Sequence, residues 1–249
     1  IRKPSDIRPS EITSEGNYLN RRQFMAAGAA AGSIALASPV LGAVVPEGEF
    51  AKLPDVRKSE FSTDETPTGY DDITTYNNFW EFGTAKDDPA KNSKDFEPRP
   101  WRITVDGHAE KTGSFHFDDF IKPFDLEERI YRLRCVEAWS MVIPWVGFPL
   151  GDLLKRFKPT SRARYVAFTT LYDPQQMPGQ KSRLLDWPYR EGLTIAEAMH
   201  PLTIIATGLY GEVLPNQNGA PLRLVVPWKY GFNSIKSIVR ISFVRTVPK

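Results

Sequence analysis

Short β-type runs separated by turn residues fill the chain from about residue 100 to its end, and they constrain the fold more than any other feature. The runs are rich in β-branched and aromatic side chains, and Gly, Pro, Asn and Asp gather between them, as is typical of strands and turns. The Asp106-Gly107 pair after the first run predicts a hairpin turn. The runs are Arg102–Val105, Ile130–Cys135, Tyr165–Leu171, Thr203–Tyr210, Leu222–Val226 and Ser237–Val244.

Two stretches predict helices. Leu150–Phe157 has apolar residues at helical spacing and cations near its end, where they suit the helix dipole. Thr194–His200 begins with Thr194 as a helix N-cap and has Glu197 three residues later, which is the spacing of a capping box. Strands outnumber these helices and do not alternate regularly with them. We therefore predict an α+β fold with mixed sheets in a single domain that is rich in β-strands.

The N-terminal region has the pattern of an export signal. The sequence Asn20-Arg21-Arg22-Gln23-Phe24-Met25 precedes a weakly apolar run of small residues, which Pro39 interrupts. A membrane anchor is the alternative, but a span of about 20 predominantly apolar residues is needed, and Ala and Gly partition poorly. The paired arginines resemble the twin-arginine signal, an export route associated with proteins that are already folded around a cofactor.

We accordingly expect three parts in the chain. Residues 1–43 form the twin-arginine signal peptide, residues 44–70 a linker or surface segment rich in prolines and charges, and residues 71–249 the main folded domain. The net charge of +2 resides in the signal, which has five cationic and three anionic side chains. Since the rest of the chain has no cationic surplus, nothing favours nucleic-acid binding.

Cys135 is the single cysteine of the sequence, which excludes an intramolecular disulfide and a zinc site made of cysteine pairs. Its own role has three interpretations: a buried apolar residue, a nucleophilic thiolate favoured by Arg132 and Arg134, or a ligand to a metal that a cofactor mostly holds. Glu137 would share the face of Cys135 if the strand continued, and could then relay protons. Its alternative is a solvated turn residue.

Two further stretches combine polar residues that can bind a ligand. Arg223 and Lys236 bracket a glycine-containing loop that could bind a phosphate through its N–H groups and the guanidinium. Solvated cations on a hairpin are the alternative. Tyr76–Gly83 mixes amides with aromatic rings, which suits a packed turn or a platform for a flat polar ring.

Taken together, these stretches resemble the periplasmic molybdenum-containing protein-methionine-sulfoxide reductase catalytic subunits, which have the sulfite-oxidase fold. The resemblance extends from about Gly69 to the last residue. It includes the run Leu-Glu-Glu-Arg-Ile-Tyr-Arg-Leu-Arg-Cys-Val-Glu-Ala-Trp-Ser-Met around Cys135. The matching pieces are Tyr76–Gly83, Pro123–Leu150, Gln176–Gln180, Glu197–Leu202 and Gln217–Lys236.

The resemblance implies a molybdopterin-binding site with one molybdenum, Cys135 as its protein ligand and Glu137 as a second catalytic residue. Trp80 stands where the family can have tyrosine, and Ser234 where it can have glycine, so we expect a main-chain contact at Ser234. The implied pterin-contacting positions are Asn77, Trp80, Glu81, Thr170, Asn218, Arg223, Ser234, Ile235 and Lys236.

The implied reaction reduces methionine sulfoxide residues of periplasmic proteins to methionine by oxygen-atom transfer to the molybdenum-molybdopterin centre. The resemblance also implies electrons from the quinone pool through a membrane haem-binding partner, and a periplasmic location after twin-arginine export. The family continues beyond the strand that ends near Lys249, so we expect this chain to be shortened at its C-terminus.

Two other functions remain open at this point. A sulfite-oxidase-like enzyme would act on a small oxyanion or a small S- or N-oxide, but strand alternation points Arg132 and Arg134 away from Cys135. A protein substrate requires instead an open, partly apolar mouth, for which Trp139, Met141 and Trp145 are candidates, each of which could equally lie in the core. From another class, the chain could be an exported binding module without metal.

Overall fold

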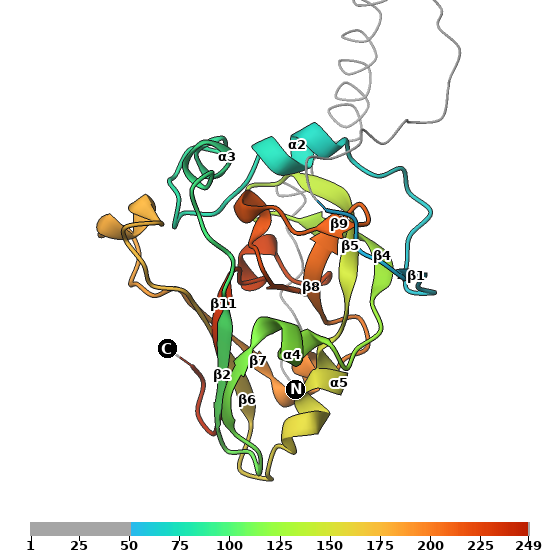
Figure 1. The fold of residues 1–249 in the computed structure, drawn as a ribbon, viewed down its shortest axis with the longest axis vertical. Helices are drawn as coiled ribbons and strands as arrows, with labels where there is room; N and C mark the ends of the chain where they lie inside the picture. Colours follow the sequence, from blue (N-terminus) through green and yellow to red (C-terminus); the bar gives the residue numbers. More distant parts are fainter. Residues whose placement is uncertain (1–50, 249) are drawn as a thin grey trace, which may run out of the picture. The chain divides into compact units, whose positions relative to one another are not determined.

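The computed structural model describes residues 51–248, so the expected signal peptide lies outside the described residues. The described structure contains two mixed β-sheets (Figure 1). In spatial order, the first contains β1 (Arg57–Lys58), β4 (Glu127–Arg134), β5 (Ser140–Pro149), β8 (Ile204–Leu209) and β10 (Arg223–Val225), with β9 (Glu212–Val213) paired to β8. The second contains β3 (Gly113–His116), β2 (Arg102–Gly107), β11 (Ile238–Val244), β6 (Tyr165–Thr170) and β7 (Arg190–Thr194).

Both sheets mix strand directions, as predicted. β1 runs parallel to β4, and β2 runs parallel to β11, whereas the β4–β5, β5–β8 and β6–β11 neighbours are antiparallel. β4 and β5 are successive strands, and they form a long hairpin that runs from Glu127 opposite Gly147 to Arg134 opposite Ser140. The closed end of this hairpin is where Cys135 lies.

Short helices connect and cover the strands. α5 has its Leu153, Leu154 and Phe157 side chains buried, and Lys158 after it adopts a left-handed conformation. α6 has the predicted capping box between Thr194 and Glu197. The helices among residues 51–248 are α2 (Tyr70–Thr75), α3 (Asp88–Asn92), α4 (Phe117–Ile121), α5 (Leu150–Phe157) and α6 (Ile195–Ala198), with 3-10 turns η2 (Pro178–Lys181), η3 (Asn216–Asn218) and η4 (Gly231–Asn233).

Two clusters of buried apolar side chains form the core. The larger extends from α5 and the second sheet to an aromatic series in which the rings of Phe79, Phe82, Phe96 and Trp101 meet edge to face. The smaller joins α2 to the first sheet. The segment 77–83 is therefore anchored in the larger core by its phenylalanines, and its polar residues are held in place by that packing.

Some predicted boundaries differ from the observed ones. β2 continues through Asp106 and Gly107, so the hairpin turn occupies residues 108–112 instead of this pair. β5 has no counterpart among the predicted runs, because Pro144, Gly147 and Pro149 interrupt its apolar sequence. Pro144 is tolerated there because the pairing of β5 with β8 starts only at Trp145.

The segment before α2 lies along the first sheet, where β1 adds two residues to the edge beside β4. Among the described helices, none is both long enough and apolar enough to cross a membrane. The segment between β6 and β7 projects from the second sheet (Figure 1). One part of it, η2, returns to contact the segment 77–83.

Candidate functional site

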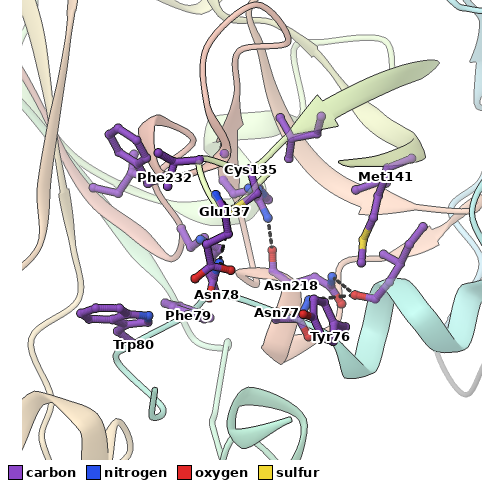
Figure 2. A pocket seen from close by; sticks show the side chains of 18 of the residues that line it. Tyr76, Asn77, Asn78, Phe79, Trp80, Cys135, Glu137, Met141, Asn218 and Phe232 are labelled. Carbon is purple, nitrogen blue, oxygen red and sulfur yellow. Dashed lines mark hydrogen bonds between the residues drawn. The ribbon is translucent and has the colours of Figure 1, made fainter. Parts of the chain in front are cut away.

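A cavity of about 280 Å³ opens beside the β4–β5 turn. Four stretches that are distant in sequence form its walls, namely residues 73–81, 133–145, 185–189 and 218–236. Figure 2 shows Cys135, Glu137 and Asn78 on one side of the cavity and Met141 and Tyr76 on the other.

Most of the residues implied by the resemblance line this cavity. Thr170 and Ser234 lie behind the lining, where the hydroxyl of Thr170 donates to the carbonyl of Lys236 at 2.8 Å and that of Ser234 accepts from the N–H of Val226 at 3.2 Å. The lining residues among the predicted set are Asn77, Trp80, Glu81, Cys135, Glu137, Asn218, Arg223, Ile235 and Lys236.

Cys135 begins a tight turn, not a continued strand. β4 ends at Arg134, the N–H of Cys135 donates to the carbonyl of Trp139 at 2.8 Å, and Ala138 closes the turn at φ 69°. The strand does not continue, so strand alternation does not place Glu137 beside Cys135. The turn brings them together instead, with the N–H of Glu137 donating to Cys135 Sγ at 3.4 Å.

Glu137 is surrounded by hydrogen-bond donors. Its Oε1 accepts from Lys86 Nζ at 2.8 Å, and its Oε2 accepts from Trp139 Nε1 at 2.8 Å and Asn78 Nδ2 at 3.2 Å. The bond from Lys86, followed by those from Trp139 and Asn78, lowers the pKa of Glu137 to about 2. Glu137 is therefore an anionic acceptor at neutral pH in this structure.

The floor of the cavity contains a buried guanidinium. Arg223 is 4% exposed, and it donates to the carbonyls of Asn218, Leu224 and Ser234 at 2.9 to 3.3 Å, while its Cζ lies 4.7 Å from the centre of the Trp145 ring. Burial lowers its pKa, yet a guanidinium keeps its proton at neutral pH. Since carbonyls neutralise no charge, an anion in the cavity would supply the missing countercharge.

Lys236 adds a second cation close to Arg223. Burial and then the charge of Arg223 lower the pKa of Lys236 from 10.5 to about 7, whereas Glu81 opposes this change. Burial in turn raises the pKa of Glu81. Gly219 has φ 106°, and a Cβ there would lie 2.8 Å from Lys236 Cβ, so only glycine permits this close approach of the loop. Two cations thus share a sheltered corner that suits a phosphate.

Two amide oxygens in the wall lack partners. The Nδ2 groups of Asn77 and Asn218 both donate to the carbonyl of Ile73, at 2.8 and 3.0 Å, which leaves each Oδ1 buried without a hydrogen bond. The indole N–H of Trp145 is also buried and unpaired. Unpaired buried polar groups are costly, so this wall is complementary to a ligand with N–H donors and an acceptor. A flat polar ring bearing a phosphate, such as a pterin, meets these requirements.

Two of the residues that bond to Glu137 were not predicted. Asn78 lies next to Asn77 in the amide and aromatic stretch, so the sequence contained a signal for it. Lys86 had none, because its contact with Glu137 joins loops that are 51 residues apart. Arg134, predicted to point away from Cys135, is among the lining residues, while Arg132 is bonded to Glu65 instead. Residues 51–248 contain no group of three or more His, Cys, Asp or Glu placed to hold a metal.

The comparisons with known proteins agree with a molybdopterin-binding site. A family model described as an oxidoreductase molybdopterin binding domain matches residues 90–249. A protein-methionine-sulfoxide reductase catalytic subunit MsrP from Xanthomonas campestris pv. campestris is 57% identical over 240 residues, covering 96% of this chain and 74% of the relative. A protein of the same name from Xanthomonas axonopodis pv. citri is 55% identical over 249 residues, covering 100% and 77%.

One solved structure supports the fold. The sulfane dehydrogenase SoxCD from Paracoccus pantotrophus matches with a TM-score of 0.53 and 16% identity, covering 85% of this chain and 56% of that chain. The present chain thus spans just over half the length of that chain. The similarity concerns the β-rich architecture alone.

Proposed function

The chain belongs to the protein-methionine-sulfoxide reductase catalytic subunits, a family of molybdopterin-binding oxidoreductases, and we propose that it reduces methionine sulfoxide residues in exported proteins. Its fold is the sulfite-oxidase-like molybdopterin fold. The observation that carries the proposal is the cavity that brings Cys135, two unpaired amide oxygens and two sheltered cations together.

The residues of the cavity fit a molybdenum-molybdopterin group, which we propose binds once per chain. When bound, this group supplies two-electron oxygen-atom transfer. The thiolate of Cys135 would bind the metal, and the Oδ1 atoms of Asn77 and Asn218 would accept hydrogen bonds from the ring. Arg223 and Lys236 would hold the phosphate, since a guanidinium donates to two phosphate oxygens at once.

The proposed reaction breaks the S=O bond of a methionine sulfoxide side chain. The sulfur gains two electrons and becomes a thioether, and the oxygen leaves as water with two protons. We propose that the electrons come from quinol through a membrane haem-binding partner. Within the protein, Glu137 and Asn78 hold an anionic acceptor and an N–H donor beside Cys135, at the point where substrate would enter.

The mouth of the cavity suits a side chain carried by a polypeptide. Val136, Phe232 and Tyr76 line the cavity and are 60%, 49% and 43% exposed, so the rim offers apolar surface to residues around the sulfoxide. The predicted mouth residues Trp139 and Met141 also line it, and Trp139 packs against Tyr76 at 5.3 Å. Trp145 is only 1% exposed and belongs to the floor.

We also propose that the protein acts in the periplasm after twin-arginine export. Arg21-Arg22 and the weakly apolar run after it support this location. Residues 1–43 would then be the signal and residues 71–249 the catalytic domain. Export in a folded state agrees with a cofactor that is enclosed by four separate stretches of the chain.

Turnover of two substrates distinguishes this function from its nearest alternative. The metal-loaded enzyme, given a reduced viologen dye, is expected to oxidise the dye when a protein containing methionine sulfoxide is added. With sulfite and an electron acceptor it is expected to be inactive. Arg134 in the lining is the feature that a small oxyanion would use. Rapid sulfite oxidation without sulfoxide reduction would overturn the proposal in favour of that alternative.

A further inference from the structure

Lys86 lies outside the lining of the cavity, but it is bonded to two residues that lie beside the proposed sulfur ligand. Its Nζ donates to Asn78 Oδ1 at 2.6 Å and to Glu137 Oε1 at 2.8 Å. Asn78 Nδ2 donates in turn to Glu137 Oε2 at 3.2 Å and to Cys135 Sγ at 3.5 Å. Ammonium, amide and carboxylate thus form a closed ring of hydrogen bonds, from which one N–H points at the sulfur.

The ammonium determines which way the amide of Asn78 faces. A carboxamide has an acceptor oxygen at one end and a donor NH2 at the other. Reversed, it would place NH2 against the ammonium of Lys86 and oxygen against the carboxylate of Glu137, and both contacts would be repulsive. With Lys86 in place, the NH2 end faces the sulfur.

The chain holds Lys86 in position from both ends. Its main-chain carbonyl accepts from the N–H of Asn77 at 2.8 Å, so the loop returns directly onto the segment that it orients. Its side chain is 25% exposed, and that of Glu137 is 39% exposed. A partly shielded pair with several hydrogen bonds is ordered better than an isolated surface pair, which contributes little.

We propose that Lys86 is a positioning residue that acts through Asn78 and Glu137 on Cys135, and so sets the electronic state of the metal that Cys135 would bind. Partners of a ligand beyond direct contact tune both the orientation of the ligand and the reduction potential of the metal. Removing the ammonium leaves Glu137 without its countercharge beside the sulfur. The uncompensated negative charge of Glu137 and the loss of the Asn78 N–H that points at Cys135 Sγ both favour the oxidised metal over the reduced metal. This inference rests on the proposed cofactor.

The test compares Lys86→Met, which keeps the length of the stem, with Lys86→Arg, which keeps the charge. The readouts are the molybdenum content, the reduction potential of the metal followed by electron paramagnetic resonance, and kcat with KM. Lys91→Met is the matched control, because Lys91 of the neighbouring helix α3 pairs with Asp87, the residue just before that helix. For Lys86→Met we expect full metal, a more negative potential and a kcat lower by about 10-fold with little change in KM. Lys86→Arg and Lys91→Met should keep the wild-type potential.

A double variant shows whether the effect passes through Asn78. In an Asn78→Leu background, Lys86→Met should shift the potential less than in the wild type, because the part that passes through Asn78 is already lost and only the uncompensated charge of Glu137 remains. A wild-type potential and signal in fully loaded Lys86→Met would overturn the inference. Loss of metal in Lys86→Met, with full metal in Lys86→Arg and Lys91→Met, would also overturn the inference, since Lys86 would then act in cofactor loading. Absence of metal in the wild type would instead refute the proposed function.

Discussion

The two buried cations of the cavity lower the stability of the cofactor-free protein, although they are the groups that would bind the cofactor. Arg223 and Lys236 lie close together, with carbonyls and the Trp145 ring around Arg223 and the carboxyl of Glu81 near Lys236. Keeping two cations out of water costs free energy in the cofactor-free protein, and a bound phosphate would offset this cost. The corner formed by Arg223 and Lys236 is therefore suited to bind an anion, which would neutralise its positive charge.

Lys236 provides a test of this opposition through pH. The unfolded chain keeps the lysine proton up to pH 10.5, whereas the folded cofactor-free chain releases it near pH 7, so unfolding takes up a proton between these values. The free energy of unfolding should therefore rise as pH increases from about 7 toward 10.5. Lys236→Met should remove this contribution, be more stable than the wild type at pH 7 and bind less cofactor.

Urea unfolding at several pH values, with and without cofactor, measures this prediction. In the loaded enzymes, the free energy of unfolding should depend on pH in the same way for the wild type and for Lys236→Met. The reason is that a bound phosphate would keep Lys236 protonated. Identical pH dependence of the two cofactor-free proteins would contradict the account of this corner.

Among the elements, η2 supports the cavity wall through its contact with the segment 77–83. The N–H of Gly179 donates to the carbonyl of Glu81 at 2.8 Å, and a Cβ on Gly179 would lie 2.0 Å from the carbonyl oxygen of Trp80. No side chain fits there without moving one of the two segments. The projecting β6–β7 segment thus braces two proposed pterin contacts.

Gly179→Ala should therefore destabilise the protein by about 1–3 kcal/mol through overpacking and lower its molybdenum content. Thr194→Ala serves as a matched control, because it removes the α6 cap at a cost of about 1 kcal/mol while leaving the cavity intact. Urea unfolding and metal analysis measure both effects. Equal metal content in the two variants would mean that η2 does not support the site.

The sequence predicted those elements whose signals are local. α5 and the capping box of α6 are confirmed, because apolar spacing and an N-cap residue act within a few positions. β5 was missed, because Pro144 and Gly147 indicate breaks in a local pattern, whereas Pro144 lies just outside the pairing of β5 with β8. The contact of Lys86 with Glu137 was also out of reach, since only the tertiary structure joins these two loops.

For the molecule as a whole, the site depends on both sheets. The β4–β5 hairpin of the first sheet supplies Cys135 and Glu137, while the chain between β10 and β11, which joins the first sheet to the second, supplies Lys236. Asn77 comes from the segment anchored in the larger core. A cofactor bound here would connect segments that are distant in sequence, so we expect binding and overall stability to be linked.

The central claim is that this cavity binds molybdenum through Cys135, and the molybdenum content per chain tests it most directly. Elemental mass spectrometry on protein exported with its own leader should find about one molybdenum per folded wild-type chain, as expected for a cavity with a single cysteine ligand. Cys135→Ser should fold, contain less metal and reduce no sulfoxide. A folded wild-type protein without molybdenum, or a Cys135→Ser variant with the metal and activity of the wild type, would contradict the account.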